Sequence, residues 1–138
     1  QAIQSFDNAL AIDPKDSYAL NGKGNALSGQ GNYTQAIQYY DKALDVDPKD
    51  KVILGNKADT LYSQGNYTQA IQYYDRAFAV DPNDTYALNG KGNSLNGNGN
   101  YTLAIQSFDK ALAIDPKDSS TLNGIGNAFM NSIRARFS

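Results

Sequence analysis

The sequence predicts an all-α fold, a solenoid of antiparallel helix pairs. Two observations predict it: short motifs that repeat with one period, and helix-ending residues that recur with the same period. Three short motifs recur at a spacing of 34 residues. A fixed period of this length is the signature of helical repeat proteins, in which each helix pair buries its apolar face against the next pair. The motifs are Asp-Pro, ending at Pro14, Pro48, Pro82 and Pro116; Gly-Asn-Tyr-Thr, starting at Gly31, Gly65 and Gly99; and Ala-Ile-Gln, starting at Ala2, Ala36, Ala70 and Ala104.

Each repeat unit predicts two helices. In the first complete unit the first helix spans about 17–30, with Asp16 as its N-cap, and it ends at Gly31. Asn32 and Gln35 form a capping-box pattern for the second helix, which ends before Pro48 because proline cannot continue a helix. Apolar spacing predicts a core made of Leu20, Leu27, Tyr33, Ala36, Tyr40 and Ala43, with their equivalents at 34-residue intervals.

The phase of the repeat leaves half a unit at each end of a single array. We expect a half repeat at 1–16 (second helix only), complete repeats at 17–50, 51–84 and 85–118, and a half repeat at 119–138, about eight helices in all. The last half repeat holds a first helix and a C-terminal extension. It lacks a glycine turn near Ile133, so its helix is expected to run on towards Phe137. Because the pattern starts and stops within a unit, we expect the chain to come from a longer array.

The repeat unit resembles the tetratricopeptide repeat. That family's pattern is Trp-x-x-Leu-Gly-x-x-Tyr, then Ala-x-x-x-Phe, then Pro. The resemblance implies a right-handed α-solenoid whose first helices line a concave, peptide-binding groove. Lys23, Lys57 and Lys91 depart from the pattern, and we expect their stems to lie on the core edge with the ammonium groups in water. The pattern appears here as Leu20-x-x-Lys23-Gly24-x-x-Leu27, Ala36-x-x-x-Tyr40 and Pro48.

The side of each first helix that lies opposite its core positions predicts the groove. At about 100° per residue, this side carries Asn and Tyr and almost no charge. Asparagine both donates and accepts hydrogen bonds, so a ladder of asparagines can hold an extended peptide backbone. The alternative is that these residues are common family residues on a solvated face. The predicted groove residues are Tyr18, Asn21, Asn25, Asn56, Asp59, Tyr62, Tyr86, Asn89, Asn93, Asn123 and Asn127.

Two further features concern the same groove. Some members of the family hold a peptide's C-terminal carboxylate with Lys and Arg, and the corresponding positions here are uncharged: Asn21, Gly22, Val52, Asn56 and Gly90. The glycines at 22, 90 and 124 fall on the groove side of the helical wheel. One explanation is a groove floor lowered for close approach of a ligand backbone, and the other is drift without function.

Composition excludes several classes of function. The 138 residues contain no His and no Cys, so the commonest general base, the thiolate nucleophile and the usual zinc ligands are missing. We therefore expect no enzyme activity, no cofactor and no metal. The net charge of −2 argues against nucleic acid as a partner, because phosphate binding relies on clustered Lys and Arg. No apolar run of about 18 residues is present, so we expect no membrane span.

Two features of the sequence bear on the cellular location. No targeting signal is visible, which favours the cytoplasm, but the chain begins with Gln1, so a removed leader and secretion stay open. Asn-x-Thr is a glycosylation acceptor only in a secreted protein. Three of its four occurrences coincide with the predicted start of a second helix, which favours a structural explanation. The four begin at Asn32, Asn66, Asn83 and Asn100.

Two functions are compatible with these patterns. The first is a scaffold for protein–protein interaction that binds a peptide or partner segment through the groove. The alternative is a structural array that self-associates into a homo-oligomer through its end helices, whose apolar faces have no partner in the repeat pattern. The residues of those faces are Ile3, Phe6 and Leu10 in the opening helix, and Leu122, Ile125, Phe129 and Ile133 in the closing helix.

Overall fold

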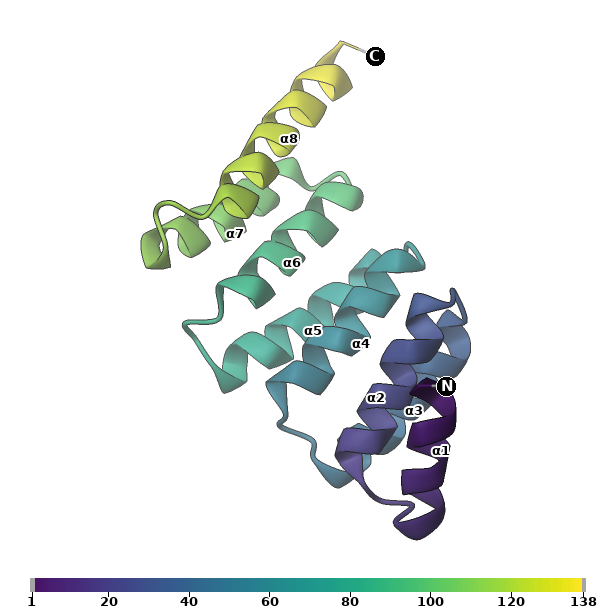
Figure 1. Cartoon of the computed structure of the whole chain (residues 1–138). Helices are drawn as coiled ribbons and strands as arrows, with labels where there is room; N and C mark the ends of the chain where they lie inside the picture. Colours follow the sequence, from purple (N-terminus) through teal and green to yellow (C-terminus); the bar gives the residue numbers. More distant parts are fainter. Residues whose placement is uncertain (1, 138) are drawn as a thin grey trace.

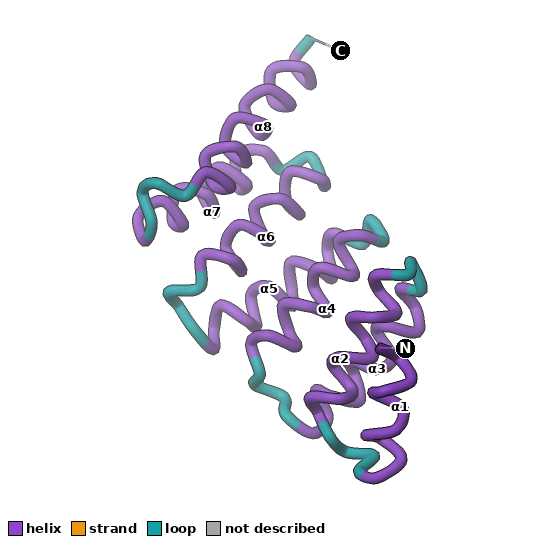
Figure 2. Tube along the Cα trace, viewed as in Figure 1, coloured by secondary structure: helices purple, strands orange, loops and turns teal. Residues whose placement is uncertain are grey.

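The computed structural model describes residues 2–137 and contains eight α-helices and no strand within that range. The helices follow one another as stacked antiparallel pairs from the N-terminus to the C-terminus (Figure 1), and short loops join them (Figure 2). The all-α solenoid prediction is confirmed. The helices are α1 (Ala2–Ile12), α2 (Ser17–Gly29), α3 (Tyr33–Val46), α4 (Lys51–Ser63), α5 (Tyr67–Val80), α6 (Thr85–Gly97), α7 (Tyr101–Ile114) and α8 (Ser119–Arg136).

We call the even-numbered helices first-type helices and the odd-numbered helices second-type helices. Each first-type helix begins at an aspartate N-cap. Asp16 accepts a hydrogen bond from the Ala19 amide at 3.2 Å, and Asp50, Asp84 and Asp118 cap α4, α6 and α8 in the same way. The backbone at these caps is extended, which aims the carboxylate at the free amides of the first turn. The N-cap prediction is confirmed.

The capping box predicted at Asn32 is wrong. Asn32 precedes α3, but its side chain makes no capping hydrogen bond, and Asn66 and Asn100 behave in the same way. Its ψ of 65° lies outside the extended region that an N-cap side chain needs. The turn is set instead by Gly31, whose φ of +83° is a left-handed conformation that favours glycine.

The first-type helices form the inner row of the solenoid. Each one contacts the next of its own kind: α2 contacts α4, α4 contacts α6, and α6 contacts α8. No second-type helix contacts another second-type helix within residues 2–137. A row whose members touch lies inside the curve, and a row whose members are spread apart lies outside it. The first-type helices therefore line the concave face.

Aromatic rings of the second-type helices pack onto glycines of the first-type helices. Phe108 in α7 is 0% exposed. A Cβ added to Gly92 would lie 2.6 Å from this ring, and one added to Gly124 would lie 2.5 Å from it. The ring is thus clamped between the first-type helix of its own repeat and that of the next repeat. Gly22 faces Phe6, Gly24 faces Tyr40 and Gly90 faces Tyr74 in equivalent contacts.

These contacts correct the interpretation of the groove-side glycines. Gly22, Gly90 and Gly124 face the aromatic ring of the preceding second-type helix, although Gly22 and Gly90 also line hollows of the concave face. Close packing explains these three glycines, because a side chain there would collide with the ring; α4 carries Asn56 at the same repeat position. The helical wheel misplaced them because it considers one helix alone and omits the neighbouring repeat that packs on the same side.

The repeated lysines pair with aspartates of the preceding second-type helix. The Lys57 ammonium donates to the Asp41 carboxylate and, at 2.8 Å, to the Tyr73 hydroxyl. Desolvation lowers the pKa of Lys57, but these two hydrogen bonds outweigh it and raise the pKa overall. The expectation of an ammonium in water is wrong for this residue, which is 7% exposed. Lys23–Asp7 and Lys91–Asp75 form equivalent pairs, and Ile125 stands where a fourth lysine would face Asp109.

The predicted core is largely confirmed, with exceptions at one position and at both ends. In α1, Ala2 is exposed, and Phe6 and Ala9 are only half-buried. Leu20, Leu27, Ala36, Tyr40 and Ala43 are buried. Tyr33 and its equivalents in α5 and α7 are only half-buried, because they lie in the first turn of each second-type helix at the edge of the pair. The α8 equivalents Leu122 and Phe129 are 50% and 53% exposed, since no second-type helix follows α8 in residues 2–137.

We expect Gly92→Leu to lower the free energy of unfolding by about 1–3 kcal/mol, because the new side chain must displace the Phe108 ring. Gly126→Leu is the matched control. Gly126 occupies the same repeat position in α8, and a Cβ there meets nothing within 4 Å. It should gain about 0.5–1 kcal/mol from helix propensity. Urea unfolding in dilute solution measures both values. Equal effects at the two positions would contradict the ring–glycine clamp.

Candidate functional site

The concave face contains a hollow of about 400 Å³ between α4, α6 and the start of α8. Five of the predicted groove residues line it: Asp59, Tyr62, Tyr86, Asn89 and Asn93. The structure therefore brings five of the eleven predicted groove residues together in this hollow. Its other lining residues are Ser63, Tyr74, Thr85, Gly90, Asp118 and Ser120.

Asp59 is the centre of the hydrogen bonds in this hollow. Its Oδ1 accepts from the Tyr74 hydroxyl, which reaches through from α5, and its Oδ2 accepts from the Tyr86 hydroxyl of α6. Burial raises the pKa of Asp59, and the two tyrosine hydrogen bonds only partly offset this effect. Burial and the bond to Asp59 raise the pKa of both tyrosines. The three side chains thus tie α4, α5 and α6 together at the hollow.

Asn89 connects α6 to the start of α8. Its Nδ2 donates to Asp118 at 3.1 Å, and its Oδ1 accepts from the Thr121 hydroxyl at 2.7 Å. Thr121 is 0% exposed. Desolvation raises the pKa of Asp118, but hydrogen bonds from Thr121, Ser120 and Asn89 outweigh it and lower the pKa overall. Asn89 is therefore a bridge between repeats as well as a lining residue.

The remaining predicted groove residues lie outside this hollow. Asn56 donates to Asn21 at 3.0 Å, and Asn25 accepts from the Tyr40 hydroxyl at 2.7 Å. Tyr18, Asn21 and Asn25 line a separate hollow at the N-terminal end, and Asn56 lines one between α4 and α6. Asn123 and Asn127 are exposed on α8. These asparagines therefore bond mainly to neighbouring helices, and they do not form one free ladder along the groove.

Two expectations about the groove need correction. It was expected to carry almost no charge, but the central hollow is acidic: Asp59 and Asp118 line it, and no Lys or Arg does. Asn21, Asn56 and Asn89, which the helical wheel places on a solvated face, are half-buried because their amides bond to a neighbouring first-type helix or to its N-cap. Asn93 is exposed and its side chain has no hydrogen-bond partner within residues 2–137.

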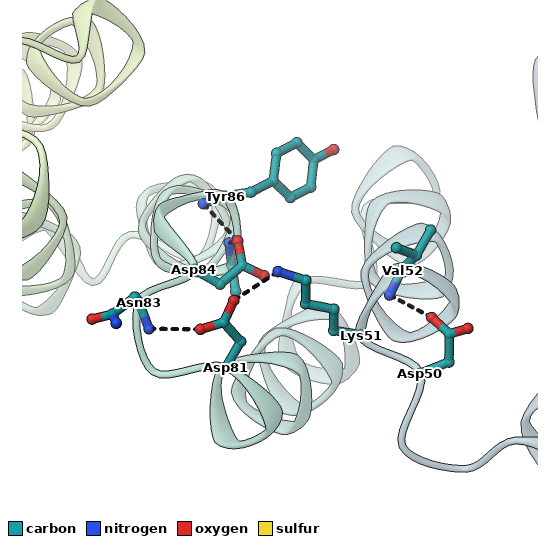
Figure 3. Close-up of polar contacts among 8 residues, drawn as sticks. Asp50, Lys51, Val52, Asp81, Asn83, Asp84 and Tyr86 are labelled. Carbon is teal, nitrogen blue, oxygen red and sulfur yellow. Dashed lines mark hydrogen bonds and ion pairs between the residues drawn. The ribbon is translucent and has the colours of Figure 1, made fainter.

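Carboxylates fix the start of α4 and the loop between α5 and α6 (Figure 3). The Asp84 carboxylate accepts a hydrogen bond from the Tyr86 amide at 3.1 Å. This bond fixes the start of α6 and the backbone position from which the Tyr86 side chain extends. The Asp81 carboxylate accepts a hydrogen bond from the Lys51 ammonium at 2.7 Å. Lys51 is the only lysine that lines the separate hollow beside Asn56, and it is therefore already paired. In Figure 3 the Tyr86 ring extends away from this ion pair.

Three lining residues of the central hollow, Tyr74, Thr85 and Asp118, were not predicted to face the groove. Tyr74 was assigned to the core alone, although a buried tyrosine must place its hydroxyl on a polar partner. That requirement is a signal that could have directed it to Asp59. Asp118 was interpreted only as a helix cap, and Thr85 was not considered. Asp118 and Thr85 line the hollow only because of how α6 and α8 stack, and no local sequence pattern specifies that stacking.

The end helices differ in how much apolar surface they expose. Ile3, Phe6 and Leu10 of α1 are half-buried against α2, so the opening face is less bare than expected. Ile125 of α8 also packs against the core, beside Phe108. Exposed apolar residues are concentrated on α8, which extends to Arg136 as predicted. They are Leu122, Phe129, Met130 and Ile133, each between 50% and 54% exposed.

Two further kinds of feature are absent from residues 2–137. No group of three or more acidic side chains converges there as metal ligands would. None of the helices in that range combines the length and hydropathy needed to cross a membrane.

Comparison with protein families identifies the family of the repeat. Three profiles of the tetratricopeptide repeat match residues 17–50, 39–72 and 56–119. Together they cover every complete unit of the periodicity described above. The chain belongs to the tetratricopeptide repeat family. A search of curated protein sequences finds no match.

Several solved structures share this fold, and two of those described next are tetratricopeptide repeat domains. The first such domain of human RPAP3 is 23% identical with a TM-score of 0.82, over 91% of this chain and 98% of that one. The first repeat domain of Spaghetti (RPAP3), bound to the HSP90 peptide SRMEEVD, is 24% identical with a TM-score of 0.78, over 86% and 94%. The MamA protein is 22% identical with a TM-score of 0.84, over 94% and 71%.

We expect Asn89→Ala to lower the free energy of unfolding by about 1 kcal/mol, because Thr121 and Asp118 each lose a hydrogen-bond partner. Asn93→Ala should change it by less than about 0.5 kcal/mol, because the Asn93 side chain is exposed and makes no such bond. Both residues line the same hollow, so the pair separates structural from surface asparagines. Thermal and urea unfolding measure both. Equal stability of the two variants would contradict the bridging role of Asn89.

Proposed function

We propose that the protein is an interaction scaffold, not an enzyme, and that it binds an extended peptide segment of a partner protein on its concave face. The observation that carries this proposal is the hollow between α4, α6 and α8. Its tyrosine rings offer apolar contact with little side-chain entropy to lose. Asn93 offers an unused donor and acceptor for a peptide backbone.

The solved relatives support a peptide ligand, although their mode of binding does not transfer. The Spaghetti repeat domain was solved with a peptide, SRMEEVD, whose last four residues include three acidic ones. The central hollow of this chain is lined by two carboxylates and by no Lys or Arg. An acidic peptide end would meet like charge here. We therefore infer a peptide that is not anchored by its own C-terminal carboxylate.

Self-association is a second candidate function, and one observation favours it. Gly24 and Gly92 each seat the aromatic ring of the second-type helix in their own repeat. Gly126 holds the same position in α8, and its seat is open. The ring at the corresponding repeat position is Phe6 of α1, which is only half-buried. The α1 helix of a second copy would thus complete the repeat that α8 begins, in a head-to-tail contact.

The peptide proposal predicts that a groove variant loses binding and an outer-wall variant does not. A random peptide library displayed on phage is selected on the immobilised protein, and the enriched peptide is synthesised with blocked ends. Asn93→Trp should weaken its binding about tenfold or more, because the indole fills the hollow. The control Gln106→Trp lies exposed on the second-type helix α7 and should leave the affinity unchanged. Binding is measured by fluorescence anisotropy.

Two outcomes would contradict the peptide proposal. One is that no peptide is enriched over a bare support. The other is that the enriched peptide binds both tryptophan variants as tightly as it binds the wild-type protein.

The self-association candidate predicts a sedimentation coefficient that rises with protein concentration. Phe129→Asp should weaken the contact by about 2 kcal/mol or more, because it places a charge at the centre of the exposed α8 face. Gly126→Leu should also weaken it, by filling the open seat. Phe137→Asp, beyond the end of α8 and 85% exposed, is the control and should have no effect. A monomer at every concentration would exclude this candidate.

A further inference from the structure

Asp59 carries a charge that its structural role does not require. The equivalent residues in the other first-type helices are Asn25, Asn93 and Asn127. In the first repeat, Asn25 accepts the Tyr40 hydroxyl through its amide oxygen at 2.7 Å. Asp59 accepts the Tyr74 hydroxyl at the same repeat positions. An amide oxygen is therefore enough to hold the tyrosine, and the carboxylate at this one position adds a negative charge to the hollow.

No Lys or Arg within residues 2–137 forms an ion pair with that charge. The described residues contain four ion pairs, and none includes Asp59 or Asp118. Three of the four hold lysines against the second-type helices, and in the fourth Lys51 is held by Asp81. A half-buried carboxylate is normally paired, because removal from water without a counter-charge is unfavourable. A cation supplied by a ligand would restore that balance.

The walls of the hollow suit a cationic side chain as well. The Tyr62 and Tyr86 rings line it and are 39% and 60% exposed. Tyr62 is held in place by Tyr67, with ring centroids 5.4 Å apart. A guanidinium or ammonium group is attracted to the face of a tyrosine ring, and more strongly where water is partly excluded. A carboxylate with two hydrogen bonds keeps further acceptor positions free.

We propose that this hollow binds a lysine or arginine side chain of the peptide that occupies the concave face. Asp59 is the main counter-charge, Asp118 adds a second one at the rim, and Tyr62 and Tyr86 flank the bound side chain. The inference rests on the proposed peptide-binding function and adds a chemical class to the partner: its bound segment is basic.

The test uses small probes, so that it does not depend on finding a peptide. N-acetyl-arginine methylamide and the citrulline equivalent, which has the same shape without the charge, are titrated into the full ¹⁵N-labelled chain. Saturable amide shifts are expected at Asp59, Tyr62 and Tyr86. The arginine probe should bind about tenfold more tightly than the citrulline probe, from one charged hydrogen bond and one ring contact.

Asp59→Asn should remove most of that difference. It keeps an acceptor for Tyr74, as Asn25 does for Tyr40, so the fold is retained. Because burial raises the pKa of Asp59, ionisation opposes folding as the pH rises above the ordinary aspartate range, and the variant should melt no lower than wild type at pH 7. Asp45→Asn, an equal change of charge at an exposed residue of α3, should keep the preference for arginine.

Equal binding of the two probes, shifts confined to the second-type helices, or an unchanged preference in Asp59→Asn would each overturn the cation site. If the site fails while the library peptide still binds the concave face, peptide binding survives without it. If the arginine probe binds as expected while no library peptide is enriched, the cation site stands and the peptide function fails.

Discussion

The contact between an aromatic ring and a glycine backbone sets the geometry of this solenoid. Phe108 is clamped between Gly92 and Gly124, and neither position can accept a Cβ unless the ring moves. Glycine in a helix interior weakens the helix by about 1 kcal/mol relative to alanine. The chain tolerates that loss because the ring then fills the space between two repeats. The ring therefore fixes how closely α6 and α8 approach each other, whereas α4 carries Asn56 and Ala58 at the same two repeat positions.

The same rings connect the core to the candidate site. Where the second-type ring is tyrosine, its hydroxyl emerges on the concave side and needs an acceptor there. Asn25 supplies one for Tyr40, and Asp59 supplies one for Tyr74. Most polar groups of the face are used in this way to hold repeats together. The groups left for a ligand are few, chiefly Asn93 and the surplus charge of Asp59.

Local signals made the helices predictable, whereas contacts between repeats were not. Asp16 and Gly31 define helix ends through backbone chemistry that acts within a few residues, so the helix boundaries followed from the sequence. Gly22 and Lys57 were misinterpreted, because each bonds or packs against the preceding repeat, 16 residues earlier in the chain. A helical wheel gives the direction of a side chain, but it does not show which neighbouring helix lies in that direction.

The most direct test of the concave-face proposal is the solution NMR structure of the complex with the selected peptide, specifically its intermolecular nuclear Overhauser effects. We expect contacts from the peptide to the rings of Tyr62 and Tyr86, which line the central hollow. Tyr39 and Tyr73 serve as internal references, because they lie on second-type helices and the ammonium groups of Lys23 and Lys57 cover their rings. Contacts to Tyr39 and Tyr73 alone would place the ligand on the outer wall and contradict the proposed function.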